Sequence, residues 1–330
     1  MPALAIADAL RAEGAEVVFA GGERAEAQLV PAAGYALEPL KVEGISRSNP
    51  LKAARAVLRA AGALGTARRI VMGADAVLGG GGYVAGPVGL AALTRRIPIV
   101  LTEADSHLGL TNRLLAPRAR RVCLAFPIDG RTGDRYLVTG RPVPPTFDDR
   151  AAARAEFGIP GDATCVLVFG GSLGARSVNL AAVEAFADAP FHVLHVPGAR
   201  DFGELRAPGE HYHVREYVSP FGTALAAADL AVARAGGSVF ELAQYGLPAI
   251  LIPYPHASAD HQTANARWMA DAGAATILSD AELSPQRLRA EVDALLGDPP
   301  KLAAMAAASR RLARPDAAAA VAREVLAAVR

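Results

Sequence analysis

The sequence is poor in aromatic residues and carries almost no net charge. Phe, Trp and Tyr make up 5% of the 330 residues, which argues against the stacking surfaces that bind single-stranded nucleic acid. The formal net charge is +1, although residues 1–150 carry 19 Lys and Arg against 14 Asp and Glu. That local excess suits an anionic lipid or a phosphate group, but it is too small to indicate nucleic-acid binding.

Disulfides and long apolar runs are also missing. Only Cys123 and Cys165 are present, both beside apolar residues, which predicts buried thiols in a reducing compartment. No secretory leader and no apolar run of membrane-spanning length is recognisable. We therefore expect a soluble protein that can lie on a membrane surface, with enough hydrophobic residues (52%) for two globular domains.

Short β-branched runs alternate with helical stretches rich in Ala, Leu and Arg. This alternation predicts an α/β fold with parallel sheets covered by helices on both faces, arranged as two similar doubly wound units. The predicted strands are residues 16–20, 76–78, 97–101, 121–124, 136–139, 165–169, 192–195, 230–232 and 249–252. The predicted helices are residues 51–66, 88–92, 176–186 and 262–272.

A proline-rich stretch over residues 140–150 marks the domain boundary, because Pro142, Pro144 and Pro145 each fix φ and discourage helix. We place an N-terminal domain at 1–143 and a C-terminal domain at 144–330, whose last helix can pack back on the first domain. The chain opens on an amphipathic helix over residues 1–10. A doubly wound domain normally opens with a strand and a glycine-rich turn, so we expect a truncated N-terminus.

Two glycine-rich clusters follow predicted strands in the second half. Gly170, Gly171, Ser172 and Gly174 stand between a strand and a helix, where backbone N–H groups and the helix dipole favour a diphosphate. A tight turn without a ligand explains them equally well. The second cluster ends in Glu241, a carboxylate that can accept ribose hydroxyls or simply complement the helix dipole. Two such loops at strand ends favour a ligand site.

Three more clusters carry polar groups. His261 and Gln262, at the start of a helix, can bind sugar hydroxyls, whereas a zinc site lacks a third ligand at a defined spacing. The four glycines at 79–82 suit a second anionic group, or form a plain flexible loop. Asp105 and His107 follow a strand and can act as general base, although a lone loop histidine is usually just solvated. A basic face on helix 51–69 suits an anionic membrane as well as an ordinary surface helix.

Taken in order, these stretches resemble the MurG family, the peripheral membrane N-acetylglucosaminyltransferases of peptidoglycan synthesis. The matching pieces span nearly the whole chain. They are residues 79–87, Glu103 with 110–112, 140–143, 170–175 with Asn179, 234–248 and 261–266.

The resemblance implies a GT-B fold, in which two Rossmann-like doubly wound domains face each other across a cleft. It also implies an inverting transfer of GlcNAc from UDP-GlcNAc to undecaprenyl-diphospho-MurNAc-pentapeptide (lipid I to lipid II), at the cytoplasmic face of the bacterial membrane and without a cofactor or metal. In the donor site, the resemblance implies a diphosphate at Ser172 and its loop, uracil at Val218, ribose at Glu241 and GlcNAc at His261 and Gln262. The remaining substrate-binding candidates are Gly171, Gly174, Arg234, Gly236, Gly237, Asp105, Arg141, Gly81, Gly82, Tyr83 and Asn112.

Three departures from the family pattern affect the expected activity. Asp105 stands where the family has an amide, and Arg141 stands where the family has Asn in Gly-Asn-Pro-Val-Arg. The family's N-terminal Gly-Gly-Thr-Gly-Gly-His loop, which carries its proposed catalytic base, has no counterpart. We therefore expect donor binding with weak turnover, and Asp105 or His107 as the substitute base. The alternatives are a degenerate, non-catalytic homologue and another GT-B enzyme, such as a glycolipid glycosyltransferase.

Overall fold

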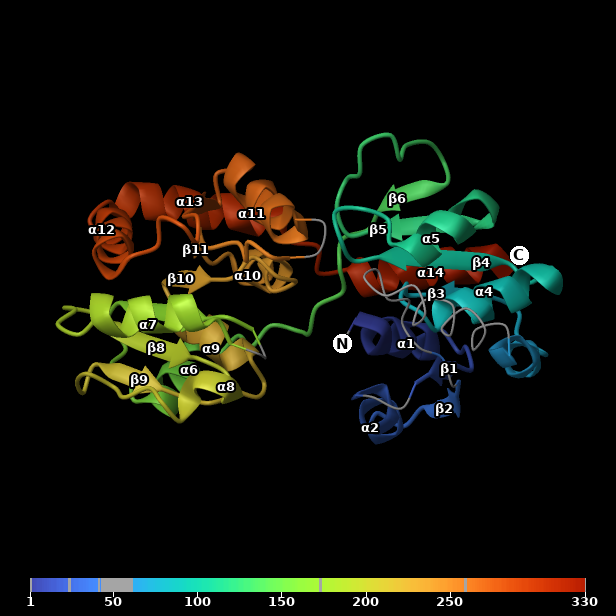
Figure 1. The fold of residues 1–330 in the computed structure, drawn as a ribbon, viewed down its shortest axis with the longest axis horizontal. Helices are drawn as coiled ribbons and strands as arrows, with labels where there is room; N and C mark the ends of the chain where they lie inside the picture. Colours follow the sequence, from blue (N-terminus) through green and yellow to red (C-terminus); the bar gives the residue numbers. More distant parts are fainter. Residues whose placement is uncertain are drawn as a thin grey trace. The chain divides into compact units, whose positions relative to one another are not determined.

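The structure is a computed structural model, and it describes residues 2–22, 25–40, 42, 62–171, 174–257 and 260–329. The chain divides into two units, Met1–Val143 with Arg314–Arg330 and Pro144–Ala313 (Figure 1). Of the linker that the sequence predicts at residues 140–150, residues 140–149 contain no helix or strand, and Arg150 begins the first helix of the second unit.

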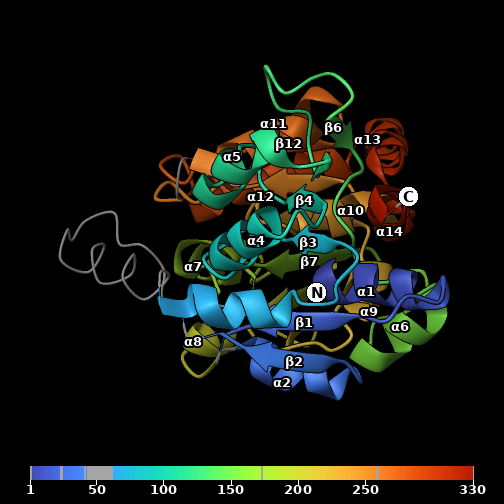
Figure 2. The ribbon, with the colours of Figure 1, turned by 90° about the vertical axis from the view of Figure 1, so that its right-hand side faces the viewer.

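The first unit contains two separate parallel sheets (Figure 2). Its strands are β1 (Val18–Gly21), β2 (Ala36–Pro39), β3 (Val77–Gly79), β4 (Ile99–Glu103), β5 (Arg121–Leu124) and β6 (Tyr136–Val138). Its helices are α1 (Pro2–Ala12), α2 (Ala25–Ala32), residues 62–70, α4 (Ala85–Thr94), α5 (Leu110–Leu115), the 3-10 turn η1 (Ala116–Arg118) and α14 (Ala317–Val329). Strands β3 to β6 pair in chain order, and β1 pairs with β2.

The C-terminal helix α14 belongs to the first unit. Ile6 and Leu10 of α1 share a buried cluster with Val321 of α14 and Val100 of β4. Ile6 and Leu10 of α1, and Val321 and Val325 of α14, are each four positions apart, so each helix buries one apolar stripe. The domain expected at 144–330 therefore ends at Ala313 as a structural unit, and residues 314–330 pack on the N-terminal one.

The second unit is built around one six-stranded parallel sheet. Its strands are β7 (Cys165–Phe169), β8 (His192–Val196), β9 (Tyr212–Val214), β10 (Leu230–Ala233), β11 (Ala249–Leu251) and β12 (Ala275–Ile277), in the order β12-β11-β10-β7-β8-β9. Its helices are α6 (Arg150–Phe157), α7 (Arg176–Ala185), α8 (Ala199–Phe202), α9 (Gly222–Ala227), α10 (Val239–Tyr245), α11 (His261–Asp271), α12 (Pro285–Leu296) and α13 (Pro299–Leu312).

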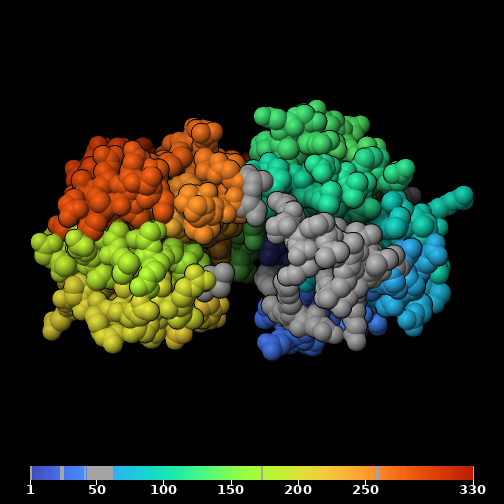
Figure 3. Space-filling view, viewed as in Figure 1, coloured from blue at the N-terminus to red at the C-terminus, as the bar shows by residue number. Residues whose placement is uncertain are grey.

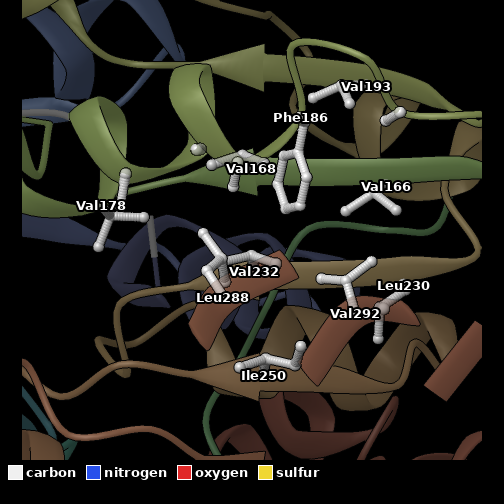
Figure 4. Packing of buried hydrophobic residues seen from close by; sticks show 14 of the residues in the cluster. Val166, Val168, Val178, Phe186, Val193, Leu230, Val232, Ile250, Leu288 and Val292 are labelled. Atoms are coloured by element: carbon white, nitrogen blue, oxygen red, sulfur yellow. The ribbon is translucent and has the colours of Figure 1, made fainter. Parts of the chain in front are cut away.

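The core of this unit follows from its strand sequences. Residues 165–169 are all buried, as expected for a central parallel strand with helices on both faces. Val166 and Val168 face Val178 of α7 and Leu288 of α12 (Figure 4). The space-filling view shows the lime-green segment that contains α7, and the orange and red segments toward the end of the chain, at the surface of this unit (Figure 3).

All nine predicted strands agree with the structure to within two residues, and 121–124 and 165–169 agree to the residue. The predictions missed β2, β9 and β12, each of which lies at the edge of its sheet. Edge strands gain their stability from pairing with one neighbour, so their own sequences need little β-branched character. Of the predicted helix 51–66, residues 51–61 lie outside the described residues, as do Lys52, Arg55 and Arg59 of its basic face.

Candidate functional site

The strand order of the second unit points to one edge of its sheet. The order reverses between β7 and β10, the two strands that lie side by side without a direct connection. In open sheets of this kind, ligands bind outside the carboxyl ends of the strands at that reversal. Phe169 ends β7 and pairs with Ala233, which ends β10. The loops that begin at Gly170 and Arg234 therefore leave the sheet at the same level.

The turn between β7 and α7 depends on glycines. A Cβ at Gly170 would collide with Ala175, and a Cβ at Gly174 would collide with the carbonyl oxygen of Pro197. Gly171 and Gly174 also have φ angles of 84° and 76°, which favour glycine. Ala175, the N-cap of α7, makes no side-chain cap hydrogen bond. The start of a ten-residue helix thus offers backbone N–H groups and a positive dipole end to an anion.

Arg234 is buried, at 7% exposure, and joins the loops around this edge. Its Nη1 donates to the carbonyl oxygens of Ile252 (3.1 Å) and Pro253 (3.2 Å) after β11. Its Nη2 donates to Ser177 Oγ (2.7 Å) in the first turn of α7, and Nη1 pairs with Asp280 Oδ1 at 2.6 Å. The guanidinium therefore fixes the loops relative to one another. Direct contact of Arg234 with a ligand stays a prediction.

Glu241 lies in the first turn of α10, after the loop that contains Gly236 and Gly237. All three residues are partly exposed. Asn265 of α11, itself buried, donates from Nδ2 to the carbonyl oxygen of Ala235 at 3.0 Å and so fixes this loop. A partly exposed carboxylate at this edge of the sheet suits the two hydroxyls of a ribose.

Helix α11 presents His261 and Gln262 at its first two positions. Asp260, the residue before it, has a φ of 53°, a conformation that costs a non-glycine residue roughly 1–2 kcal/mol. Its Oδ1 accepts a hydrogen bond from Thr263 Oγ1 at 2.6 Å, which offsets part of that cost. Gln262 Oε1 accepts from the Tyr254 N–H at 2.9 Å, so a sugar hydroxyl would meet its Nε2 group.

Val218 follows β9 and is buried, so its contact with a base stays a prediction. The ring of Phe221, three residues later, packs edge-on against Phe169 with centroids 5.0 Å apart. Since Phe169 directly precedes Gly170, this contact brings the segment after β9 to the same edge of the sheet.

In the first unit, Glu103 organises the loop after β4. The side chain is 8% exposed, and its Oε2 accepts from the Gly109 N–H (2.8 Å) and from Asn112 Nδ2 (3.0 Å). Its Oε1 accepts from the Asp105 N–H at 3.2 Å. Asp105 and His107 stand on this loop, and both are partly exposed.

Asn112 connects this loop to the glycine loop after β3. It is fully buried, and its Nδ2 also donates to the carbonyl oxygen of Thr102 at 2.8 Å. A Cβ on Gly81 would lie 3.4 Å from the same nitrogen, and Thr111 Oγ1 donates to the carbonyl oxygen of Gly82 at 2.7 Å. Asn112 therefore supports the two loops from inside, and its predicted contact with a substrate would require the loops to move.

The predicted residues form two groups, one in each unit. Tyr83 and Arg141 are partly exposed, and Tyr83 reaches the end of β1, where a Cβ on Gly22 would lie 3.5 Å from its hydroxyl. Ser172 lies outside the described residues. The first unit holds Gly81, Gly82, Tyr83, Asp105, His107, Asn112 and Arg141, and the second holds Gly171, Gly174, Val218, Arg234, Gly236, Gly237, Glu241, His261 and Gln262.

Several polar residues behind the glycine turn were not predicted from the sequence. Ser177 and Asp280 bind Arg234, and His195 and Asp201 are fully buried. Burial lowers the pKa of His195 to about 4, with the charge of Asp201 opposing that shift. The sequence did contain an indication, because His195 interrupts the apolar run Val193-Leu194-His195-Val196. Ser177 and Asp280 are 103 positions apart and carry no such signal.

The described part of the chain shows neither a metal cluster nor a membrane-spanning helix. Those residues contain no group of three or more His, Cys, Asp or Glu side chains that could hold a metal ion. None of their helices has the length and apolar character needed to cross a membrane.

Both halves of the chain match known sequence families. Residues 1–124 match the glycosyltransferase family 28 N-terminal domain, and residues 165–321 match the glycosyltransferase family 28 C-terminal domain. The chain is 43% identical to a protein of Salinibacter ruber, over 99% of this chain and 92% of that protein. It is 44% identical to one of Alkalilimnicola ehrlichii, over 98% and 93%. Both are named UDP-N-acetylglucosamine–N-acetylmuramyl-(pentapeptide) pyrophosphoryl-undecaprenol N-acetylglucosamine transferase.

Solved structures confirm the predicted α/β GT-B fold. The crystal structure of Acinetobacter baumannii MurG superposes with a TM-score of 0.80 at 29% identity, covering 99% of this chain and 95% of that one. The calicheamicin glycosyltransferase CalG4 shares the fold alone, with a TM-score of 0.67 at 19% identity over 99% and 91%. The chain therefore belongs to glycosyltransferase family 28 and, within it, to the MurG family of N-acetylglucosamine transferases.

Proposed function

We propose that this protein transfers GlcNAc from UDP-GlcNAc to undecaprenyl-diphospho-MurNAc-pentapeptide, which converts lipid I into lipid II. The observation that carries the proposal is the 43–44% identity, over almost the whole chain, to relatives named for this reaction. The position of the glycine turn at the strand-order reversal supports it, because a nucleotide diphosphate binds at that place in related sheets.

For the donor, we assign the diphosphate to the turn at Gly170, Gly171 and Gly174 and to the start of α7. Glu241 binds the ribose, and the backbone of Val218 binds the uracil. His261 and Gln262 bind the GlcNAc hydroxyls. The fixed loop positions support this assignment, since preformed sites lose less entropy when they bind.

The reaction is a single displacement with inversion. The C4 hydroxyl oxygen of the acceptor sugar forms a bond to the anomeric carbon of GlcNAc while the bond from that carbon to the UDP oxygen breaks. The negative charge that develops on UDP is stabilised by the N–H groups and dipole at the start of α7, which are in place before the reaction. The hydroxyl proton passes to a general base.

We propose that Asp105 or His107 is this base, because Glu103 holds their loop and both side chains are partly exposed. Asp105→Asn and His107→Gln keep the shapes of the side chains and remove the basic group. Replacing the base should lower kcat on the order of 100-fold or more and leave KM for UDP-GlcNAc nearly unchanged. If both single variants keep full activity, neither residue is the base.

For the acceptor, we assign the diphosphate to the loop with Gly81 and Gly82, and nearby contacts to Tyr83 and Arg141. The positive φ angles of the two glycines, 76° and 72°, support this assignment, because they turn successive backbone N–H groups in a way that can form an anion-binding concavity. Asn112 holds the loop from the buried side.

We further propose that the protein acts as a peripheral protein on the cytoplasmic face of the membrane. Leu110 and Leu114 of α5 are 45% and 65% exposed, one helical turn apart. The exposed Arg113 lies between them in sequence, and the exposed Arg118 follows. Leucines that enter the acyl boundary next to arginines that meet anionic headgroups are typical of an interfacial surface.

Vesicle sedimentation tests this surface. Leu110→Ser and Leu114→Ser should each weaken binding to vesicles of phosphatidylglycerol about 10-fold, since a buried leucine contributes roughly 1.5 kcal/mol. Leu180→Ser is the matched control, because Leu180 is 51% exposed on α7 of the other unit. Equal binding by all variants would contradict the assignment of this surface.

The whole proposal is tested with the chain as it stands. Calorimetry should show that UDP-GlcNAc binds, and a lipid I analogue with labelled GlcNAc should yield the disaccharide product at a low rate. Donor binding without any transfer would support a non-catalytic homologue. Release of a free sugar from UDP-GlcNAc without an acceptor would instead indicate a different reaction on the same fold.

A further inference from the structure

A chain of buried polar side chains runs behind the glycine turn of the second unit. His195, Asn179 and Asp201 are 0%, 0% and 1% exposed, and Tyr212 is 3% exposed. Tyr212 Oη lies 2.8 Å from His195 Nδ1, and His195 Nε2 lies 3.0 Å from Asn179 Oδ1. Asn179 Nδ2 donates to Asp201 Oδ2 at 2.7 Å and to the carbonyl oxygen of Pro197 at 3.1 Å.

The direction of every hydrogen bond in this chain is determined. Asn179 Nδ2 faces a carboxylate and a carbonyl, which only accept, so the amide orientation is fixed and Oδ1 must accept from His195. His195 therefore carries its proton on Nε2, and its Nδ1 accepts from the Tyr212 hydroxyl. A neutral imidazole in this single tautomer agrees with a pKa lowered by burial.

The chain ends on the glycine turn. Pro197, whose carbonyl oxygen accepts from Asn179, is the residue that leaves no room for a Cβ at Gly174. The backbone N–H of Asn179 also donates to the carbonyl oxygen of Ala175 at 2.8 Å. The backbone bond is the regular i→i−4 bond of α7, so the side chain of Asn179 supports the turn through Pro197, whose carbonyl oxygen lies beside Gly174.

Packing alone does not account for this arrangement. Burying four polar side chains costs desolvation free energy that an apolar core of the same volume avoids. The neighbouring positions Val178, Ala182 and Val193 belong to an apolar cluster. A polar network in which every group is hydrogen-bonded instead fixes a single geometry. This network lies directly beside the glycine turn, which has to keep one shape.

We propose that Asn179, oriented by His195 and Asp201, is a positioning residue that holds the glycine turn in the shape that binds the donor diphosphate. This inference rests on the proposed donor site. Asn179 does not contact the ligand; it fixes the position of the N–H groups that do. Removing it should weaken binding of the diphosphate and leave binding of the nucleoside unchanged.

The experiment compares the dissociation constants of UDP and uridine by calorimetry on the full chain. In the wild type, UDP should bind more tightly than uridine by a measurable factor. Asn179→Ala should reduce that factor 10-fold or more, with uridine affinity changed less than 2-fold. KM for UDP-GlcNAc should rise accordingly, with any change in kcat smaller.

Three further variants separate positioning from loss of folding. His195→Gln keeps a donor toward Asn179 Oδ1 and should preserve the UDP-to-uridine ratio, whereas His195→Leu removes that donor and should lower it. Ser309→Ala is the control for stability. Ser309 is also fully buried, but its hydroxyl donates to the carbonyl oxygens of Leu242 and Leu247, at another place in the unit. It should lower the melting temperature and leave the ratio unchanged. His195→Leu also provides the test if Asn179→Ala does not fold.

The outcomes distinguish this inference from the proposed function. An unchanged ratio in folded Asn179→Ala and His195→Leu would overturn the positioning role and leave the donor site standing. An equal loss of UDP and uridine affinity would also overturn it, since that is the pattern of general destabilisation. A wild-type protein that binds neither ligand would overturn the donor site and the inference together.

Discussion

Acidification should destabilise the second unit through His195. The folded unit holds this imidazole neutral, with a pKa of about 4, whereas an exposed histidine has a pKa near 6.5. Between these two values the unfolded chain binds the extra proton and the folded unit does not. Stability is therefore complete above about pH 6.5 and falls as the pH drops toward 4. From about pH 7.5 to about pH 5, the loss due to His195 is about 2 kcal/mol.

The variant His195→Gln isolates this effect, because glutamine cannot titrate and still donates to Asn179. His192 and His213, whose pKa values burial also lowers, are present in both proteins, so their contributions cancel. Trp268 is the single tryptophan of the sequence and lies on α11, so its fluorescence reports unfolding of the second unit in urea. Between the two pH values, the wild type should lose about 2 kcal/mol more than the variant. Equal losses would refute the assignment of a buried, neutral His195.

Three other outcomes are expected. Gly174→Ala should weaken UDP binding at least 10-fold, because the new Cβ collides with a carbonyl oxygen. Gly158→Ala, with a similar φ of 71° and free space around its Cβ, should lower only the stability. Calorimetry measures the affinity and melting curves the stability, and equal UDP affinities of the two variants would contradict the assigned turn. Glu241→Gln should weaken UDP binding and reduce the preference for UDP over its 2′-deoxy form, measured by calorimetry; an unchanged preference would remove Glu241 from the ribose site. Burial raises the pKa values of Cys123 and Cys165 to about 12. Both thiols should therefore react with a thiol reagent about 1,000-fold more slowly in the native protein than in the urea-unfolded chain. Fast labelling of the native protein would contradict their burial.

The central strands were predictable because each is a short apolar run buried on both faces. Residues 121–124 and 165–169 pair with neighbours on both sides, so their sequences carry the full signal. Strand β2, Ala-Leu-Glu-Pro, has almost no such apolar, β-branched character. Its extended conformation depends on pairing with β1. The sequence predicted that the last helix can pack back on the first domain, and the structure shows α14 there, against the apolar face of α1.

The loops of the candidate donor site could be predicted from the sequence, because their glycines meet a local requirement of the backbone. Glycine is needed where a strand turns tightly into a helix, and Gly170 and Gly174 show that need at their own positions. The buried side chains that hold these loops in place could not be predicted from the sequence. Arg234 and Asp280 meet at 2.6 Å across 46 positions, and His195 meets Asn179 at 3.0 Å from a different element.

The sequence by itself determined the α/β class, the family and the glycine-rich turns, because local propensity and the order of motifs along the chain are properties of neighbouring residues. The tertiary structure alone decided the strand order, the reversal between β7 and β10, and the buried hydrogen bonds that fix the turn at Gly174. Those features depend on which distant segments share one core, and a hydrogen bond between them exists only after the sheet has brought them together.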